Sequence, residues 1–178
     1  RKAMHHIAFH CFEEDLPRFK SQIEAAGLRL LDPPPGFDSN GLWLRDQDGL
    51  LLEIRVGPKT SPDAKTPMEL APPPPGIRNA PYRRVATREP PRRLSHILMF
   101  TPDVDRAIAF YTRMLGLRVS DRSGDVIAFL HGVHGSDHHL MAFVKSEAPG
   151  LHHLSWDVPS IGAIGLGAMQ MAEKGFSH

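Results

Sequence analysis

Short apolar runs and one helical period define a first repeated unit. Strand-like runs occupy residues 4–11, 28–32, 41–46 and 49–56, separated by residues typical of turns. Between the first two runs, Leu16, Phe19 and Ile23 are spaced for one face of a helix, which Gly27 ends. The pattern predicts a β-α-β-β-β order in the first segment of the chain.

The same order returns in the second half. A strand-like run at residues 94–101 precedes a helix that Asp103 caps, with Ile108, Tyr111 and Leu115 on one face and Gly116 at its end. Strands are predicted at residues 117–122, 126–132 and 138–144. A third copy starts with a strand in 151–160 and continues into the stretch "IGAIGLGAMQMAEKG", which we interpret as a helix because its glycines lack phosphate-loop spacing.

Proline-rich sequence separates the two segments. Residues 58–93 have no period, little apolar content and four consecutive prolines, as expected of a linker. We therefore predict a module at 1–57, a linker at 58–93, and a module followed by the start of another at 94–178.

Composition narrows the function classes. A formal net charge of +1 gives no basis for binding nucleic acid or an anionic membrane, and no apolar run is long enough to span a membrane. Cys11 is the single cysteine, so no disulfide can form within the chain, which fits a reducing cytoplasm.

The 11 histidines gather at the edges of apolar runs. Aligning the three copies on the histidine before the apolar run places His6, His96 and His153 in register. Because strand side chains alternate between faces, these three histidines should point the same way in each copy.

These motifs together resemble the type I extradiol dioxygenases of the vicinal-oxygen-chelate superfamily. "AIAFYTRMLGLRVSD" is similar to the FYxxxLG signature of the superfamily, and "LRDQDGLLLEIRV" resembles its closing hairpin. A histidine doublet in "DHHLMAF" that lies about 14 residues before the doublet in "LHHLSWDV" matches the extradiol pattern. The resemblance implies an α+β fold of repeated βαβββ modules that pair into cup-shaped mixed sheets, with a metal-free first domain.

The resemblance also implies the site. His96 and His153 match the two metal-binding histidines, and His139 matches the acid/base histidine of the reaction. Two imidazoles and one carboxylate form the facial triad of non-haem Fe(II) enzymes, so the implied cofactor is Fe(II), with Mn(II) as the other candidate. The implied partners are a catecholic substrate and O2, in a cytoplasmic homo-oligomer that binds neither nucleic acid nor membrane.

The chain departs from the family pattern at both ends. Family members have a module before "HHIAFH" and a glutamate ligand on strands that follow the position of His178. We expect the full polypeptide to continue with such strands. A less favoured alternative is a hybrid triad of His6, Glu53 and His96.

Other residues have simpler interpretations. We expect His138 and His152 to face away from their site neighbours, with His138 either structural or supporting the site from behind and His152 packed. His131 and His134 are expected in a turn, with solvated or lid roles. Phe129, Phe143 and Trp156 are predicted core residues.

Two other functions remain open from the sequence. One is a glyoxalase-like metal-dependent lyase or isomerase, which would leave His139 without a role. The other is a metal-free, drug-sequestering module of the same fold, which would need no ordered histidine pair.

Overall fold

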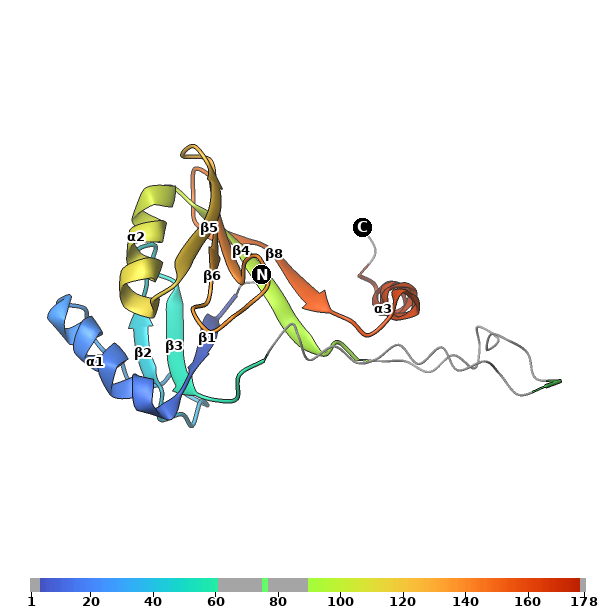
Figure 1. Cartoon of the computed structure of the whole chain (residues 1–178), viewed down its shortest axis with the longest axis horizontal. Coiled ribbons are helices and arrows are strands. Elements are labelled where there is room, and N and C mark those ends of the chain that lie inside the picture. Colours follow the sequence, from blue (N-terminus) through green and yellow to red (C-terminus); the bar gives the residue numbers. More distant parts are fainter. Residues whose placement is uncertain (1–3, 61–74, 77–89, 177–178) are drawn as a thin grey trace. The chain divides into compact units, whose positions relative to one another are not determined.

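The computed structural model describes residues 4–60, 75–76 and 90–176 (Figure 1). It comprises two compact units, one from the described residues among 1–62 and 96–154 and the other from those among 63–95 and 155–178. Most of the predicted linker therefore lies outside the described residues, and the predicted domain boundaries stay a prediction.

The first module contains three strands and one α-helix. Strand β1 (His6–Cys11) leads through a short 3-10 helix, η1 (Glu13–Asp15), into α1 (Leu16–Ala25), followed by β2 (Leu42–Arg45) and β3 (Leu51–Val56). The sheet order is β1-β3-β2, with β3 parallel to β1 and antiparallel to β2. The strand predicted at 28–32 is wrong, because only Leu31 forms an isolated bridge, with Trp43.

The second module is complete. Strand β4 (Arg93–Thr101) is followed by α2 (Val104–Leu115), β5 (Arg118–Ser123), β6 (Ile127–His131) and β7 (Met141–Lys145). Strand β8 (Gly150–Asp157) and α3 (Ile161–Glu173) begin the third copy. The second sheet has the order β5-β6-β7-β4-β8, in which β4 and β7 are parallel and β6 is antiparallel to β5 and β7. The predicted α+β fold with mixed sheets is confirmed, and the second module has the full βαβββ order while the first has one strand fewer.

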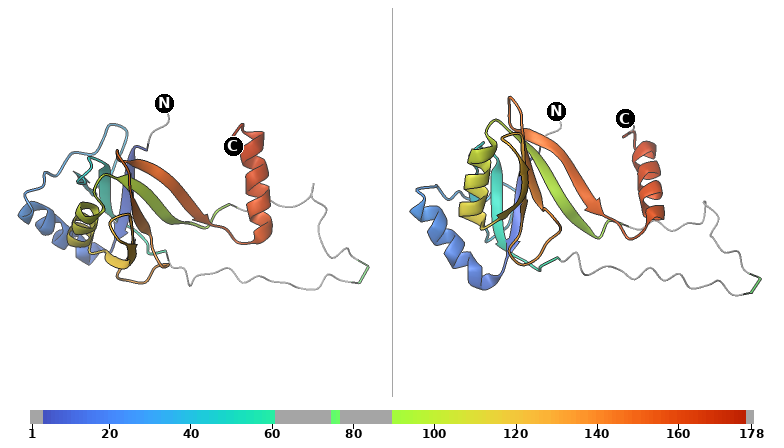
Figure 2. Two further views of the ribbon diagram at one scale, coloured as in Figure 1. Left: turned by 90° about the horizontal axis from the view of Figure 1, so that it is seen from above. Right: turned by 45° about the horizontal axis from the view of Figure 1, so that its top comes forward.

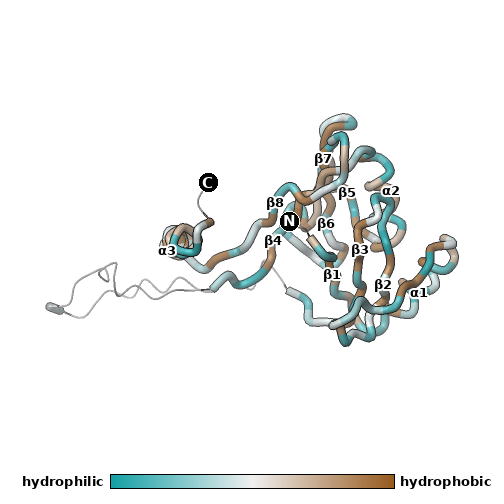
Figure 3. The backbone as a smooth tube through the Cα atoms, turned by 180° about the vertical axis from the view of Figure 1, so that it is seen from behind, coloured by the Kyte–Doolittle hydropathy of each residue, from teal (hydrophilic) through white to brown (hydrophobic). Residues whose placement is uncertain are grey.

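A single hydrophobic core joins the two modules of the first unit. Helices α1 and α2 lie beside each other on one side of the strands (Figures 1 and 2). Ile23 and Ile54 of the first module and Met99 and Phe143 of the second belong to the same buried cluster. Figure 3 colours hydrophobic residues brown, and they include residues of β3, which is buried along most of its length.

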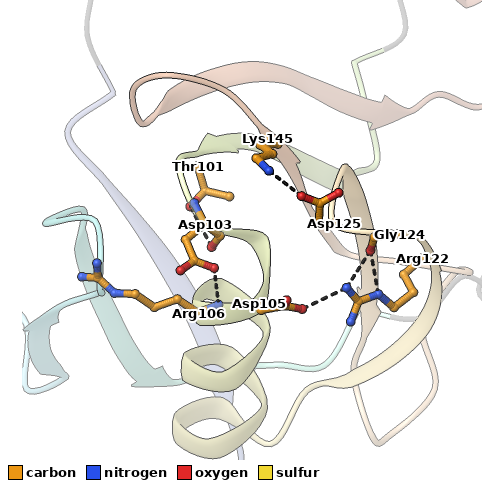
Figure 4. A network of polar contacts seen from close by, with 8 residues as sticks. All are labelled: Thr101, Asp103, Asp105, Arg106, Arg122, Gly124, Asp125 and Lys145. Carbon is orange, nitrogen blue, oxygen red and sulfur yellow. Dashed lines mark hydrogen bonds and ion pairs between the residues drawn. The ribbon is translucent and has the colours of Figure 1, made fainter.

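Helix α2 begins and ends where the sequence predicts. The Asp103 carboxylate accepts a hydrogen bond from the Arg106 backbone N–H at 3.0 Å (Figure 4), which satisfies one of the free N–H groups at a helix start. At the other end, Gly116 takes the left-handed conformation, with φ 68°, that stops the helix. Surface ion pairs between Arg122 and Asp105 and between Lys145 and Asp125 surround the helix start.

Polar contacts link the turn between β2 and β3 to the second module. The buried Tyr111 hydroxyl of α2 donates a hydrogen bond to Asp46 Oδ2 at 2.9 Å. Thr101 Oγ1, at the end of β4, donates to Asp48 Oδ2 at 2.6 Å, and the Arg106 guanidinium donates to the Gln47 carbonyl. The tyrosine of the FYxxxLG motif therefore anchors the acidic turn of the neighbouring module.

The second unit contains α3 and the outer ends of two strands. Arg92 and Arg93 pair with the Asp157 carboxylate at 3.1 and 3.4 Å. The Ser160 side chain caps α3 by accepting from the Ala163 N–H. Trp156 is 53% exposed, so its predicted place in the core is wrong. No helix in the described residues is both long enough and apolar enough to cross a membrane.

Candidate metal and acid/base site

Three histidines from separate segments of the chain meet in one cluster. His96 lies in the middle of β4, His153 lies in β8, and His139 lies two residues before β7. Their contacts connect all three, since His96 Nε2 is 3.1 Å from His153 Nε2 and the rings of His96 and His139 have centroids 4.4 Å apart. The structure therefore brings together the three site residues that the sequence singled out.

Strand alternation explains why the His96 side chain points away from the buried core. Its neighbours Ile97 and Met99 are buried in the core beneath the helices, so His96 points to the opposite face of the sheet. On that face, Leu98 of β4 pairs in register with Ala142 of β7, which pairs with Phe129 of β6. Leu98 and Ala142 are buried and Phe129 is half-buried, so these residues form an apolar layer beside the histidines.

The nitrogen pair of His96 and His153 has the spacing of two ligands on one ion. Two imidazole nitrogens, each about 2.0–2.1 Å from one ion, are about 2.9 Å apart at a right angle and about 3.4 Å apart at the tetrahedral angle. The observed 3.1 Å between the Nε2 atoms lies between these values, and it is also a hydrogen-bonding distance if one ring donates to the other. The donor atoms present therefore fit a divalent first-row metal ion, for which neutral imidazole is a common ligand.

The electrostatics of the cluster favour neutral rings. Desolvation lowers the pKa of His96, and the nearby His153 ring lowers it further. Desolvation likewise lowers the pKa of His139, with His96 as the next cause, while the negative charge of Asp137 acts in the opposite direction on both rings. Neutral imidazoles keep the lone pair that binds a metal or accepts a proton.

The backbone around His139 differs from the prediction. His138 and His139 were expected on a strand, pointing to opposite faces, but β7 begins only at Met141. The two rings instead contact each other edge to face, with Nδ1 atoms 3.2 Å apart, and both contact the Phe129 ring. The alternation argument therefore does not apply here, although it is His139 whose ring lies against His96.

His152 is also closer to the site than expected. Its Nδ1 is 2.8 Å from His153 Nδ1, and its ring lies 4.8 Å from the Phe100 ring, centroid to centroid. The Phe100 contact agrees with the expected packing role of His152, whereas its contact with His153 was not expected. The doublet in the sequence was the signal for this contact, but alternation argued against it.

Phe129 and Asp137 are the site neighbours that sequence reasoning missed. Phe129 was interpreted as a core residue, yet its ring lies on the histidine face, 4.9 Å from the His139 ring. Asp137 acts on the pKa of both His96 and His139. Its position directly before the "HH" doublet was the available signal.

The first module contains a histidine–carboxylate pair, His6 and Glu53. His6 Nε2 is 3.9 Å from Glu53 Oε2, and Glu53 is only 2% exposed. The Ser39 hydroxyl donates a hydrogen bond to the Glu53 carboxylate, and Trp43 lies against the His6 ring. Within the described ranges, no three His, Cys, Asp or Glu side chains are grouped to hold a metal ion, so the hybrid triad of His6, Glu53 and His96 is not formed.

His131 and His134 both have protein partners. His131 is the last residue of β6, so its predicted place in a turn is wrong, and its Nδ1 is 2.6 Å from Ser120 Oγ. His134 contacts the Phe12 ring at 4.9 Å, centroid to centroid. The loop before His139 is therefore attached to the first module at His134.

Known proteins resemble this chain in sequence and in fold. Residues 93–177 match the family described as the Glyoxalase/Bleomycin resistance protein/Dioxygenase superfamily. The whole chain is 49% identical over 178 residues to "Metapyrocatechase 2" of Cupriavidus necator and covers 56% of that protein. The chain thus spans little more than half the length of this relative.

Solved structures share the fold at lower identity. An Mn(II)-bound glyoxalase from Novosphingobium aromaticivorans superposes with a TM-score of 0.64 at 23% identity, over 95% of this chain and 51% of that one. An extradiol ring-cleaving dioxygenase from B. fuscum gives a TM-score of 0.65 at 20% identity, over 97% of this chain and 46% of that one. Residues 93–177, which carry the three histidines, thus resemble the Glyoxalase/Bleomycin resistance protein/Dioxygenase superfamily in sequence, and the chain shares the fold of these two solved structures.

Proposed function

We propose that this chain is part of an Fe(II)-dependent extradiol dioxygenase, which opens the ring of a catechol beside its two hydroxyls. The observation that carries the proposal is the meeting of His96, His139 and His153 on one face of the second sheet. The 49% identity to a metapyrocatechase supports it. In the reaction, a ring carbon–carbon bond breaks and both atoms of O2 enter the product.

His96 and His153 would hold the metal through their Nε2 atoms. A carboxylate that would complete a facial triad is not grouped with them in the described residues. Bound there, Fe(II) would gather the diol and O2 and let electrons pass from one to the other. Mn(II) is the other candidate, since a related dihydroxybiphenyl dioxygenase is named as manganese-dependent.

His139 would move the proton. Its lowered pKa keeps the ring neutral near neutral pH, so it can accept a proton from a catechol hydroxyl and later return it. The half-buried Phe129 ring, which contacts His139, would offer the aromatic ring of the substrate an apolar contact beside the polar diol site.

The test is turnover of catechol by the protein expressed from its complete gene and loaded anaerobically with Fe(II). We expect oxygen uptake with the appearance of a ring-opened product. His139→Gln should retain iron and lower turnover by about a hundred- to ten-thousand-fold. His134→Gln, in the same loop but against Phe12, should behave as wild type.

Two results would contradict the proposal. One is iron-loaded protein that consumes no oxygen with catechol or 2,3-dihydroxybiphenyl. The other is a His139→Gln variant that retains full turnover, which would remove the proton-transfer role.

A further inference from the structure

The contact between His152 and His153 has a consequence for the candidate metal ligand. His153 directs Nε2 toward His96 at 3.1 Å and Nδ1 toward His152 at 2.8 Å. A neutral imidazole carries a proton on only one of its nitrogens. Nε2 of His153 can therefore offer a lone pair only when the proton resides on Nδ1, which faces His152.

At that distance the two Nδ1 atoms form a hydrogen bond in which one donates and the other accepts. If His153 Nδ1–H donates, His152 Nδ1 must be the acceptor, with its own proton on Nε2. The Phe100 ring packs against the His152 ring, with centroids 4.8 Å apart, and so restrains the orientation of His152 as the acceptor. Residues that hold the second nitrogen of a metal-binding histidine set its tautomer and ring orientation.

We propose that His152 is a positioning residue for His153: its Nδ1 accepts the Nδ1–H of His153 and thereby leaves the Nε2 lone pair directed toward His96. The inference extends the proposed metal site by assigning a partner to one of its two histidines. It also explains why two histidines stand side by side here, since the His152 ring is needed to direct the Nε2 lone pair of His153.

The other doublets have a similar contact. His5 and His6 have Nδ1 atoms 2.9 Å apart, and His138 and His139 have theirs 3.2 Å apart. In each case the second histidine contacts a further polar partner, Glu53 for His6 and His96 for His139. The first doublet, remote from the His96–His153 pair in sequence and in contacts, provides a matched control.

Two substitutions separate the hydrogen bond from the packing. His152→Asn keeps an acceptor oxygen near the position of Nδ1 but removes the ring. His152→Phe keeps a ring against Phe100 but removes the acceptor. His5→Phe makes the corresponding change in the first doublet, where the Phe37 ring stacks on His5 at 5.2 Å.

The first measurement is the tautomer of His153 in metal-free protein, by long-range 1H–15N correlation at about pH 8, where ordinary imidazoles are neutral. We expect the Nδ1–H form in wild type and His152→Asn, and a loss of that preference in His152→Phe. The second measurement is Mn2+ affinity, which should fall about 10- to 100-fold in His152→Phe. His152→Asn and His5→Phe should bind Mn2+ as wild type does.

The tautomer of His153 tests the proposal independently of enzyme activity. A wild-type His153 that protonates Nε2, or a His152→Phe variant that keeps the Nδ1–H preference, overturns it. So does a His152→Asn variant as impaired as His152→Phe, because the ring and not the acceptor would then matter. Failure of wild type to bind any Mn2+ would count against the proposed metal site and leave the tautomer result to decide the role of His152.

Discussion

The hydrogen bond from Tyr111 to Asp46 should make a measurable contribution to stability, because it joins the two modules in a buried environment. The Tyr111 hydroxyl is 2.9 Å from Asp46 Oδ2, and both residues are buried. Asp46 Oδ1 already accepts from the N–H groups of Asp48 and Leu50, each at 2.9 Å. Tyr111→Phe would therefore leave Oδ2 without its hydroxyl partner while the rest of the turn stays in place.

The expected magnitude follows from the charge of the acceptor. Hydrogen bonds to charged groups contribute about 1.5–3 kcal/mol, compared with about 0.5–1.5 kcal/mol for neutral pairs. Tyr111→Phe should thus lower the free energy of unfolding by about 1.5–3 kcal/mol. For a chain of this size, that corresponds to a fall in Tm of about 3–12 °C.

The pH dependence of the loss identifies its origin. Burial raises the pKa of Asp46, while the Tyr111 hydrogen bond opposes that rise. Burial also raises the pKa of Tyr111 well above its ordinary value, so the hydroxyl stays protonated and donates. Above the raised pKa of Asp46 the carboxylate is charged and the full cost of Tyr111→Phe applies. As the pH falls through that pKa, the carboxyl becomes neutral and the cost should shrink.

The assay is urea unfolding followed by circular dichroism, at neutral pH and near pH 4, for the wild type, Tyr111→Phe, Asp46→Asn and the double variant. Asp46→Asn keeps the Oδ1 acceptor and removes the charge, so Tyr111→Phe should cost about 1 kcal/mol less in that background. A loss under about 0.5 kcal/mol, or an equal loss in both backgrounds and at both pH values, would refute the reasoning.

Three further predictions concern the site and its surroundings. His96→Ala should abolish Mn2+ binding, measured by titration, whereas His6→Ala should not. Gly41→Ala would place a Cβ 2.9 Å from a backbone oxygen and should destabilise by about 1–3 kcal/mol in urea unfolding, while Gly150→Ala, with open space around it, should be neutral. Desolvation lowers the pKa of His96 and His139, so metal-free protein should lose stability as pH falls below about 6.5. His139→Gln should weaken this pH dependence of stability. An unchanged pH profile in the variant would argue against a lowered pKa of His139.

The sequence by itself determined the repeated modules and the identities of the three central histidines. Strand alternation and helical spacing are local properties of the chain, so they predicted β4, α2 with its Asp103 cap and Gly116 end, and the availability of His96 opposite Ile97. The same reasoning wrongly predicted a strand at 28–32. Leu31 forms an isolated bridge there, and the apolar residues beside it, all of them described by the structure, do not continue the pairing.

Only the tertiary structure decided which residues contact the histidines. Phe129 contacts His139, and Phe100 contacts His152, because the pairing of strands and the path of the loop before β7 bring distant segments together. Alternation could not place His138 or His139, since the backbone there is not a strand. The lowered pKa of His96 likewise depends on desolvation and on a ring 57 positions away, which no local pattern encodes. Local periodicity therefore specified the elements, while packing between them specified the chemistry.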